Sequence, residues 1–302
     1  MLLHPLPAFE TQAASPRGDA SARVLPLLDR ADHRAPSVFR PENMLREARR
    51  QKGLSAGNVP RICILDPDGD MVDFVRAQRQ ATRSPHWACY HTDMWEWEEG
   101  GLAFGIVGYA VGASFAVLVA EQVFVSGCDL LVSVASAGQI AEQAPVSYHV
   151  LIERSLRDEG TSYHYLPPSP YAEADPALLA LARTAFAGAG CPVLSGATWT
   201  TDAPFRETEA GIATRKGQGL LAVEMEAAAL YAFSAARHRP VLCLAHVTNQ
   251  MGQVEGDFEK GCHNGASTSM ALVRAFATAW TAQADARIDP RGGARATTLK
   301  IA

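Results

Sequence analysis

Short apolar runs alternate with segments of helical spacing along most of the chain. Runs typical of buried strands lie at residues 61–65, 102–107, 130–134, 146–152, 192–200, 219–223 and 240–247. Segments typical of helices lie around them, at residues 39–48, 71–80, 114–124, 175–187, 227–236 and 266–282. The helices of such a chain cover both faces of the sheet, because each must bury its apolar side. The alternation therefore predicts an α/β fold with three α/β/α layers around a central mixed sheet.

The two ends of the chain lack this alternation. Residues 1–36 are rich in proline, alanine, serine, arginine and aspartate without a sustained period, so we expect a flexible N-terminal arm. Residues 283–302 are expected to form a disordered C-terminal tail. A single domain is therefore predicted over residues 37–282, and 48% hydrophobic content is enough to give it a substantial core.

Charge and cysteine usage argue against several classes of protein. The formal net charge is −5, which gives no support for a surface that binds nucleic acid. No apolar run reaches the length of about 18 residues that a membrane-spanning helix needs, so we expect no membrane segment. The six cysteines are scattered, and none lies at the spacing of a metal site. We therefore predict no metal and a reducing, cytoplasmic location.

Small and polar residues gather where the predicted strands end. Five such places are Gly69-Asp70, Ser136-Ala137-Gly138, residues 201–206, Glu224-Met225-Glu226 and Thr248-Asn249. Because ligands of α/β sheets bind beyond the strand ends, this coincidence predicts an enzyme that acts on a small molecule. Neither GxGxxG after the first strand nor GxxxxGK[ST] is present, so no nucleotide cofactor is predicted.

Two carboxylates flank a methionine just before the 227–236 helix, in the run Glu224-Met225-Glu226. Carboxylates are rarely buried unless something binds them. Two groups that only accept hydrogen bonds suit a ligand rich in hydroxyl donors, such as a sugar, and the polarizable methionine suits its apolar face. The alternative is a solvated first helical turn, where the helix dipole favours glutamate.

Several segments together resemble the nucleoside phosphorylase superfamily, which includes purine nucleoside phosphorylases, uridine phosphorylases and hydrolytic nucleosidases. They are Val134-Ala-Ser-Ala-Gly138, Leu156-Arg-Asp-Glu-Gly-Thr-Ser162, Ser195-Gly-Ala-Thr-Trp-Thr-Thr-Asp202, and Val223-Glu-Met-Glu-Ala227 followed by residues 240–249. The resemblance extends over residues 61–282. It implies a phosphorylase/hydrolase-like fold, a homo-oligomer (dimer, trimer or hexamer), and cleavage of a nucleoside's N-glycosidic bond without a cofactor.

The resemblance implies roles for the residues around the sugar. Glu226 would hold the ribose 2′- and 3′-hydroxyls, Met225 would lie against the sugar, and Glu224 would be a second acceptor nearby. The small-residue loop predicted at residues 135–138 would border the substrate through Ser136, Ala137 and Gly138. A carboxylate beside the sugar would stabilise the cation-like ribosyl group that forms as the base leaves.

At the base, the resemblance points to Asn249, where many family members have an aspartate that protonates the purine N7. An amide cannot transfer a proton in this way, but it both donates and accepts hydrogen bonds. The departure argues against 6-aminopurine nucleosides and fits 6-oxopurine nucleosides or uridine. The alternative is that Asn249 caps a turn or a helix. Thr201, Phe205 and Arg206 would border the base, with Phe205 stacked on it, unless Arg206 is simply a surface charge.

The residues expected to bind phosphate are missing. Phosphorolysis needs a dianion beside the anomeric carbon, and arginine is its usual holder. Hexameric phosphorylases of the family have arginines at the positions of Asp73, just past Gly69, and of Ser133, just before Ser136. A carboxylate repels phosphate but suits a water molecule. Gly69, Asp73 and Ser136 are therefore predicted to form a water or anion site, in which Asp73 orients or deprotonates the attacking water.

Three functions remain open on these grounds. A hydrolytic nucleosidase is favoured, because both arginines are absent. A phosphorylase with inorganic phosphate as co-substrate, giving ribose 1-phosphate, is the first alternative; its phosphate would be held by other residues or by residues 40–50 of a neighbouring subunit. A non-catalytic nucleoside-binding protein is the second. Asp73 has no role in any of them if it lies on the exposed face of the 71–80 helix.

Two clusters of aromatic and histidine residues have no place in this scheme. One runs from His86 to Trp97, and its histidines, His86 and His91, fit no standard metal spacing. We expect packing or a subunit interface there, with His91 reaching a neighbour's site as an alternative. The other cluster, Tyr163-His164-Tyr165, would line the 5′ end of the sugar or pack as half-buried aromatics.

Overall fold

A computed structural model of the chain describes residues 25–29, 32–143, 147–188, 190–251, 255, 257–258 and 260–288. Most of the expected arm, residues 1–24 and 30–31, lies outside the described residues, as do residues 289–302 of the expected tail. The prediction of a tail is wrong for residues 283–288, because helix α7 (Ala266–Ile288) continues through them. Four of these six residues, one glutamine, two alanines and one arginine, are good helix formers.

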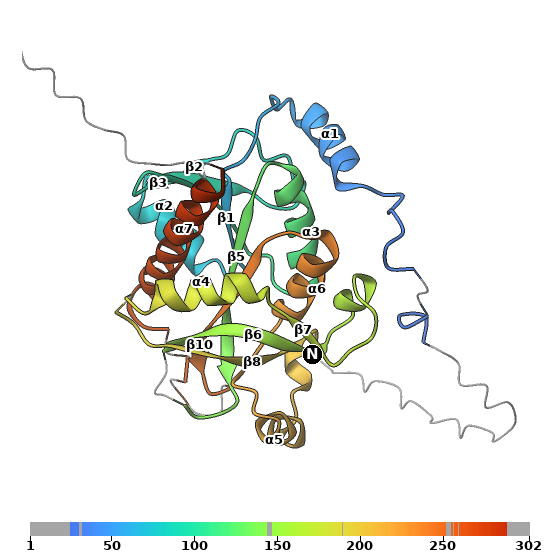
Figure 1. Cartoon of the computed structure of the whole chain (residues 1–302), viewed down its shortest axis with the longest axis vertical. Helices are drawn as coiled ribbons and strands as arrows, with labels where there is room; N and C mark the ends of the chain where they lie inside the picture. Colours follow the sequence, from blue (N-terminus) through green and yellow to red (C-terminus); the bar gives the residue numbers. More distant parts are fainter. Residues whose placement is uncertain are drawn as a thin grey trace, which may run out of the picture.

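The core is one mixed sheet (Figure 1), in which neighbouring strands follow the order β10-β6-β8-β9-β5-β1-β4-β3-β2, with β7 beside β6. This confirms the predicted α/β fold with a mixed sheet. The bounds of the ten strands in the described part of the chain are β1 (Ile62–Asp66), β2 (Thr82–Arg83), β3 (Met94–Glu99), β4 (Leu102–Gly108), β5 (Leu130–Gln139), β6 (Tyr148–Asp158), β7 (Tyr171–Glu173), β8 (Val193–Thr201), β9 (Ala222–Glu224) and β10 (Val241–Asn249).

Half of the sheet closes on itself. Strand β5 pairs with β1, with β10 and, through its last residues, with β9. Strand β10 pairs with β6, β6 with β8, and β8 with β9, so the ladder returns to β5. The register sets Gly138 opposite Asn249 on β10 and opposite Val223 on β9. Three of the predicted site segments meet for this reason, although they lie far apart in the sequence.

The predicted loop at residues 135–138 is a strand in the structure, so that prediction is wrong. Strand β5 continues to Gln139, because its end pairs with β10 on one side and with β9 on the other. Gly138 suits this crowded position: a Cβ atom there would clash with the Met251 sulfur and lie 3.3 Å from the Asn249 amide oxygen. The small side chains that suggested a loop instead allow close packing of strands.

The helices form two groups that cover the sheet (Figure 1). Helix α7 packs against α2 and α4 in one group, and α3 packs against α1 and α6 in the other. This confirms the three predicted layers. The helices not yet delimited are α1 (Pro41–Lys52), α2 (Asp70–Gln78), α3 (Ala113–Val125), α4 (Pro176–Phe186), α5 (Glu209–Gly217), α6 (Ala227–Arg237) and the short 3-10 helices η1 (Thr161–His164), η2 (Pro204–Arg206) and η3 (Cys262–Gly265).

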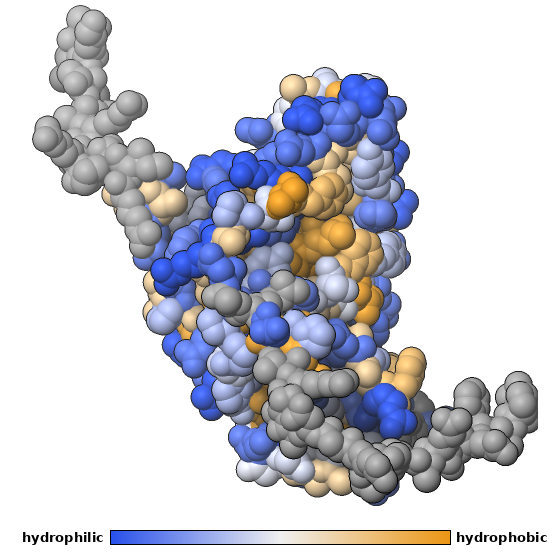
Figure 2. All heavy atoms as spheres, turned by 90° about the vertical axis from the view of Figure 1, so that its right-hand side faces the viewer, coloured by the Kyte–Doolittle hydropathy of each residue, from blue (hydrophilic) through white to orange (hydrophobic). Residues whose placement is uncertain are grey.

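The surface is not uniformly polar. Figure 2 shows a patch of apolar atoms on the side of the molecule that lies on the right in Figure 1. The exposed large apolar side chains of the described residues include Val38, Phe39, Val111 and Leu118. Within the described part of the chain, no helix combines the length and the hydropathy needed to cross a membrane.

The His86–Trp97 cluster packs into the body of the protein. Trp97 is buried and stacks on Phe104 at 5.3 Å between ring centroids. The Trp87 indole N–H donates to the Thr92 hydroxyl at 3.0 Å. Among the described residues, no group of histidine, cysteine, aspartate and glutamate side chains could hold a metal ion. The buried tryptophans of the cluster therefore pack beside β3 and β4, whereas Tyr90 and His91 are exposed.

Candidate active site

A cavity of about 590 Å³ opens where β5, β9 and β10 end. Seven of the residues predicted from the sequence line it: Ser136, Ala137, Gly138, Phe205, Glu224, Met225 and Asn249. Residues that sequence reasoning missed also line it, among them Asp68, Glu207, Glu209, Ile212, Phe258 and Lys260. The closed half of the sheet thus brings most of the predicted site together.

Glu224 is saturated with hydrogen bonds from the protein itself. Its Oε1 accepts from the hydroxyls of Ser155, Thr198 and Thr200, at 3.1, 3.1 and 2.6 Å. Its Oε2 accepts from the backbone N–H groups of residues 226 and 227, at 2.8 and 2.7 Å. Burial raises the pKa of Glu224, and these hydrogen bonds act in the opposite direction. Glu224 therefore ties the start of α6 to strands β6 and β8, and has little capacity left for a sugar.

Replacing Glu224 with alanine is expected to destabilise the fold by about 3–5 kcal/mol, because several buried donors would lose their partner. Denaturant unfolding measures this loss. Glu209→Ala is the matched control, since Glu209 also lines the cavity but is exposed, and it should change the free energy of unfolding by less than about 0.5 kcal/mol. Equal stability of the two variants would contradict the structural role of Glu224.

Glu226 occupies the position just before α6 and is only 2% exposed. Its Oε1 accepts from the Gly112 backbone N–H at 2.6 Å, and its Oε2 from the Met225 N–H at 3.3 Å. Burial, followed by the charge of Glu224, raises the pKa of Glu226 to about 8. Glu226 is not among the residues that line the cavity, but its neighbour Met225 is. Unlike Glu224, it retains unused acceptor capacity.

Asn249 ends β10, lines the cavity and makes the turn-capping contact that was the alternative to a role at the base. Its Oδ1 accepts from the Met251 backbone N–H at 2.9 Å, which is a turn-capping contact. Its Nδ2 donates to the Thr248 hydroxyl at 3.1 Å. The second N–H of the amide makes no hydrogen bond within the described chain and offers a donor to a ligand in the cavity, while the oxygen keeps one lone pair.

Asp68 is the main residue that the sequence analysis missed. It follows β1 and lines the cavity, and its Oδ2 accepts from the Ser136 backbone N–H at 2.7 Å. A backbone N–H at a strand end is a natural donor to an anion. Here a carboxylate of the chain itself occupies that donor. The run of aspartates from Asp66 to Asp70 was the available signal, but it does not say which of them faces the cavity.

Asp73 does not reach the cavity, so its predicted placement beside Ser136 is wrong. Its side chain is 64% exposed on α2, where it lies 3.7 Å from Arg76 and accepts from the Tyr109 hydroxyl at 2.9 Å. Gly69 is separated from the cavity as well, since the Tyr109 ring packs directly on it. Asp73 therefore takes the alternative placement on the exposed helix face. Ser133, the other expected arginine position, is buried inside β5.

The far end of the cavity is formed by η2 and α5. Phe205 lines this end and is 99% exposed, whereas Glu207 is partly buried and burial raises its pKa to about 7. Thr201 and Arg206 were predicted here but do not line the cavity. The Thr201 hydroxyl instead accepts from the backbone of residue 203, and Arg206 is exposed on a surface turn.

The cavity is acidic. Among its described lining residues, the acidic side chains are Asp68, Glu207, Glu209 and Glu224, and Lys260 is the single basic one. The Lys260 ammonium is 2.5 Å from a carboxylate oxygen of Asp70, so its charge is already balanced. A phosphate dianion here would face the carboxylates of Asp68 and Glu209, with no unpaired basic side chain among the described lining residues.

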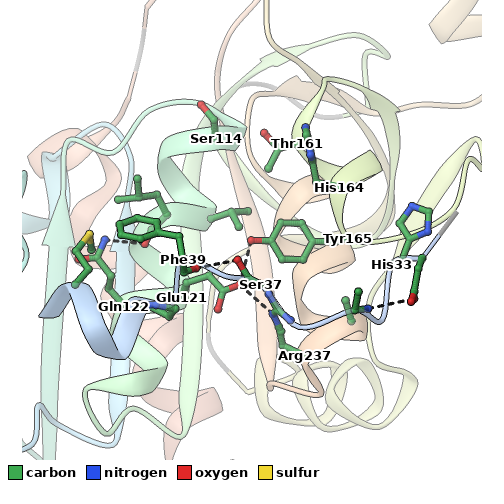
Figure 3. Close-up of a pocket in the computed structure, with 17 residues that line it drawn as sticks. His33, Ser37, Phe39, Ser114, Glu121, Gln122, Thr161, His164, Tyr165 and Arg237 are labelled. Carbon is green, nitrogen blue, oxygen red and sulfur yellow. Dashed lines mark hydrogen bonds and ion pairs between the residues drawn. The ribbon is translucent and has the colours of Figure 1, made fainter. Parts of the chain in front are cut away.

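A second cavity, of about 790 Å³, lies between residues 32–41 and helices α3, η1 and α6 (Figure 3). Its polar centre is Glu121, which accepts from the Tyr165 hydroxyl at 3.1 Å and from Arg237 at 3.0 Å. None of the residues predicted from the sequence to hold the ribose hydroxyls, the base or the water lines it. His164 and Tyr165 belong to this second cavity, so the Tyr163-His164-Tyr165 cluster does not line a sugar in the first one.

A family model described as the phosphorylase superfamily matches residues 61–278. A uridine phosphorylase from Vibrio fischeri ES114, complexed with 6-hydroxy-1-naphthoic acid, is similar with a TM-score of 0.63 and 17% identity, over 78% of this chain and 98% of that chain. Another structure of uridine phosphorylase from that organism gives 0.61 and 18%, over 76% and 94%. No curated protein sequence gives a significant match.

Proposed function

The chain belongs to the phosphorylase superfamily, and on that premise we propose that it cleaves the N-glycosidic bond of a nucleoside and releases the free base. The 590 Å³ cavity is large enough for a nucleoside. Its polar groups converge from three strand ends, which is where α/β sheets bind ligands. The proposed substrate is a 6-oxopurine nucleoside or uridine, and the proposed acceptor is water.

The sugar would lie between Met225 and the start of α6. Met225 lines the cavity and offers an apolar, polarizable surface. Glu226 lies next to it, and its carboxylate accepts only two hydrogen bonds from the described protein. The remaining lone pairs of Glu226 suit the 2′- and 3′-hydroxyls of ribose. Glu224 supports the site by positioning α6 and not by binding the sugar.

The base would lie between Asn249 and Glu207. The second amide N–H of Asn249 suits a carbonyl oxygen, and the Glu207 carboxylate suits an adjacent ring N–H. The two groups line the same cavity. A ring carbonyl next to a ring N–H occurs in 6-oxopurines and in uracil, whereas a 6-aminopurine has the opposite pattern. This supports inosine, guanosine or uridine over adenosine.

The observation that most supports water as the acceptor is the 2.7 Å hydrogen bond from the Ser136 N–H to Asp68. The donor that would otherwise face an anion is occupied by a carboxylate. In the proposed reaction, the C1′–N bond breaks and its electron pair leaves with the base, while a water oxygen bonds to C1′. Asp68 takes the proton of that water. The departing base accepts a hydrogen bond from Asn249 and takes up a proton from solvent.

A phosphorylase remains the first alternative, because Lys260 lines the cavity and would become a phosphate ligand if it left Asp70. The test is base release from inosine, guanosine, uridine and adenosine in phosphate-free buffer, with and without added inorganic phosphate. Free ribose without added phosphate supports hydrolysis. Ribose 1-phosphate that forms only with phosphate would replace this proposal with phosphorolysis, and binding without any cleavage would leave a non-catalytic nucleoside-binding protein.

Replacing Glu207 with alanine is expected to raise KM for inosine by about 10–100-fold, the effect of losing one charge-assisted hydrogen bond to the base. Glu207→Gln should lose less, because its amide oxygen still accepts. Initial rates over a range of inosine concentrations measure both effects. The Glu209→Ala variant is the control on the same segment, and an equal loss in that variant would show that Glu207 has no specific contact with the base.

Two further properties belong to this proposal. The six cysteines are all free, which supports a reducing, cytoplasmic location. The apolar patch of Figure 2 supports a homo-oligomer, and light scattering of the purified protein would test it. No metal or organic cofactor is proposed, and inorganic phosphate would be needed only in the phosphorylase alternative.

A further inference from the structure

Helix α5 forms one wall of the cavity, yet it is weakly anchored in the protein. None of its side chains is buried. Ile212 alone among its residues joins an apolar cluster, where it packs with Trp199 and Val223. Glu209 and Ile212 line the cavity, and Glu207 lies just ahead of the helix. The position of the residue proposed to contact the base therefore depends on a helix that apolar packing barely holds.

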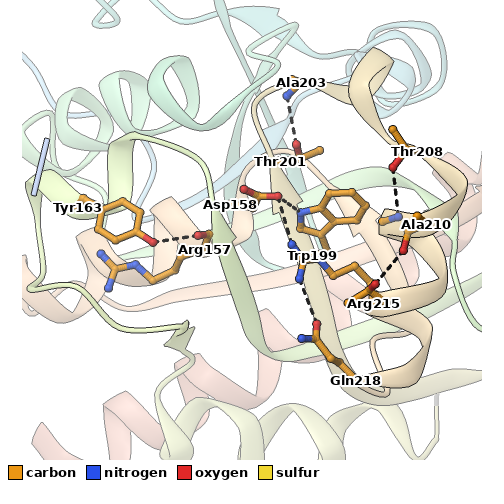
Figure 4. A network of polar contacts seen from close by, with 12 residues as sticks. Arg157, Asp158, Tyr163, Trp199, Thr201, Ala203, Thr208, Ala210, Arg215 and Gln218 are labelled. Atoms are coloured by element: carbon orange, nitrogen blue, oxygen red, sulfur yellow. Dashed lines mark hydrogen bonds and ion pairs between the residues drawn. The ribbon is translucent and has the colours of Figure 1, made fainter. Parts of the chain in front are cut away.

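Near its C-terminal end, α5 is held to the rest of the protein by polar contacts of Arg215 (Figure 4). The Arg215 guanidinium lies 5.3 Å from the centroid of the Trp199 ring and 3.6 Å from a carboxylate oxygen of Asp158. The Trp199 indole N–H donates to the same Asp158 carboxylate at 3.0 Å. Arg215 also donates to the Gln218 side chain at 3.3 Å, which keeps it within its helical turn. The arginine side chain is only 24% exposed.

Trp199 and Asp158, the residues that contact Arg215, lie on the strands that also position Glu224. Trp199 lies on β8 between Thr198 and Thr200, whose hydroxyls hold Glu224. Asp158 ends β6 and pairs in register with the end of β8. Arg215 thus connects α5 to the strands that position Glu224 and the start of α6. A short helix is a rigid rod, so a hold near its C-terminus also sets the position of its N-terminus.

We propose that Arg215 is a positioning residue, which holds α5 against Trp199 and Asp158 and so keeps Glu207 at the base end of the cavity. This inference rests on the proposed function, because it uses the contact between Glu207 and the base. Arg215 itself touches no substrate, since it does not line the cavity. Arg215 holds the helix through a cation–π contact and an ion pair, which break and re-form more readily than a buried apolar interface.

The test compares Arg215→Met with Lys216→Met, which removes the same charge from the exposed neighbouring residue of α5. Arg215→Met should raise KM for inosine by about 3–10-fold, with a smaller change in kcat, because the base site becomes misplaced in a fraction of molecules. Hydrogen exchange of the α5 backbone should accelerate in the same variant and stay unchanged in the central strands. Arg215→Lys should restore part of both effects, and Lys216→Met should change neither.

A second, milder variant distinguishes the loss of this contact from a general loss of folding in Arg215→Met. Asp158→Asn removes one partner of Arg215 at a half-exposed position and should shift KM and α5 exchange in the same direction by a smaller factor. Faster α5 exchange with unchanged KM overturns the inference, because Arg215 would then only stabilise the helix. Unchanged exchange overturns it as well.

Whether the proposed function itself is wrong is tested separately, by measuring nucleoside cleavage by the wild-type protein. If the wild type cleaves no nucleoside, calorimetric affinities for inosine and hypoxanthine replace KM in the same set of variants. Weaker binding in Arg215→Met than in Lys216→Met then still supports the role of Arg215. Equal affinities, or no binding by the wild type, overturn it.

Discussion

Replacing Asp68 with asparagine is expected to lower the rate of base release by about 10²–10⁴-fold, the range for losing a general base. Asp68 is the carboxylate that reaches the cavity wall and accepts the Ser136 N–H. Asparagine keeps the shape and can still accept that hydrogen bond through its amide oxygen, but it cannot take a proton from water. The fold should therefore survive while the chemical step is lost.

Asp73→Asn is the matched control for this prediction. It makes the same chemical change five residues later, on the exposed face of α2. Its rate should stay within about twofold of the wild type, since exposed positions away from a site rarely matter. Steady-state kinetics in phosphate-free buffer measure both variants. A large loss in Asp73→Asn with full activity in Asp68→Asn would restore the assignment that the sequence suggested.

Replacing Glu226 with glutamine is expected to lower activity by about 10²–10³-fold and, at the same time, to stabilise the fold at alkaline pH. The loss of activity is expected because an amide cannot ionise, whereas the Glu226 carboxyl group can give up its proton when the cation-like ribosyl group forms beside it. The gain in stability follows from burial, which raises the pKa of Glu226 from its ordinary value of 4.5 to about 8. Between these two values the folded protein keeps a proton that the unfolded chain has released.

The sign of the pH effect follows from that difference. Stability contributed by the protonated Glu226 is fully present below about pH 4.5, and it falls as the pH rises towards 8, by up to about 1.4 kcal/mol per pH unit. Glutamine does not titrate, so its advantage over the wild type should grow with pH and level off above about 8. Urea unfolding at about pH 6 and about pH 8.5, on either side of the raised pKa, measures this advantage.

Asp66 also makes the stability depend on pH, and it does so equally in the wild type and in the Glu226→Gln variant. Burial also raises the pKa of Asp66, to about 7, so part of the pH dependence remains in the glutamine variant. Only the difference between the two proteins reports on Glu226. If Glu226→Gln were as active as the wild type, the sugar contact would be refuted, and an equal difference in stability at both pH values would refute the buried, protonated carboxyl group.

The sequence was sufficient for the fold class and for most of the segments that line the candidate cavity. Burial of apolar residues has a local period, so alternating strands and helices are visible in the order of residues alone. The ends of parallel strands collect polar groups, so Ser136, Glu224 and Asn249 could be predicted to meet. Their meeting place is the cavity at the ends of β5, β9 and β10.

The tertiary structure alone decided which side chains face that cavity. Asp68 reaches Ser136, 68 positions away in the chain, because β1 and β5 are neighbours in the sheet. Asp73 turns outward because it sits on the first turns of α2, where a change of one or two residues in phase moves a side chain to the opposite face. Glu224 became a structural anchor only because three hydroxyls from β6 and β8 surround it. Local periodicity determines which residues are buried, whereas the direction of a polar side chain depends on partners that only the closed sheet brings near.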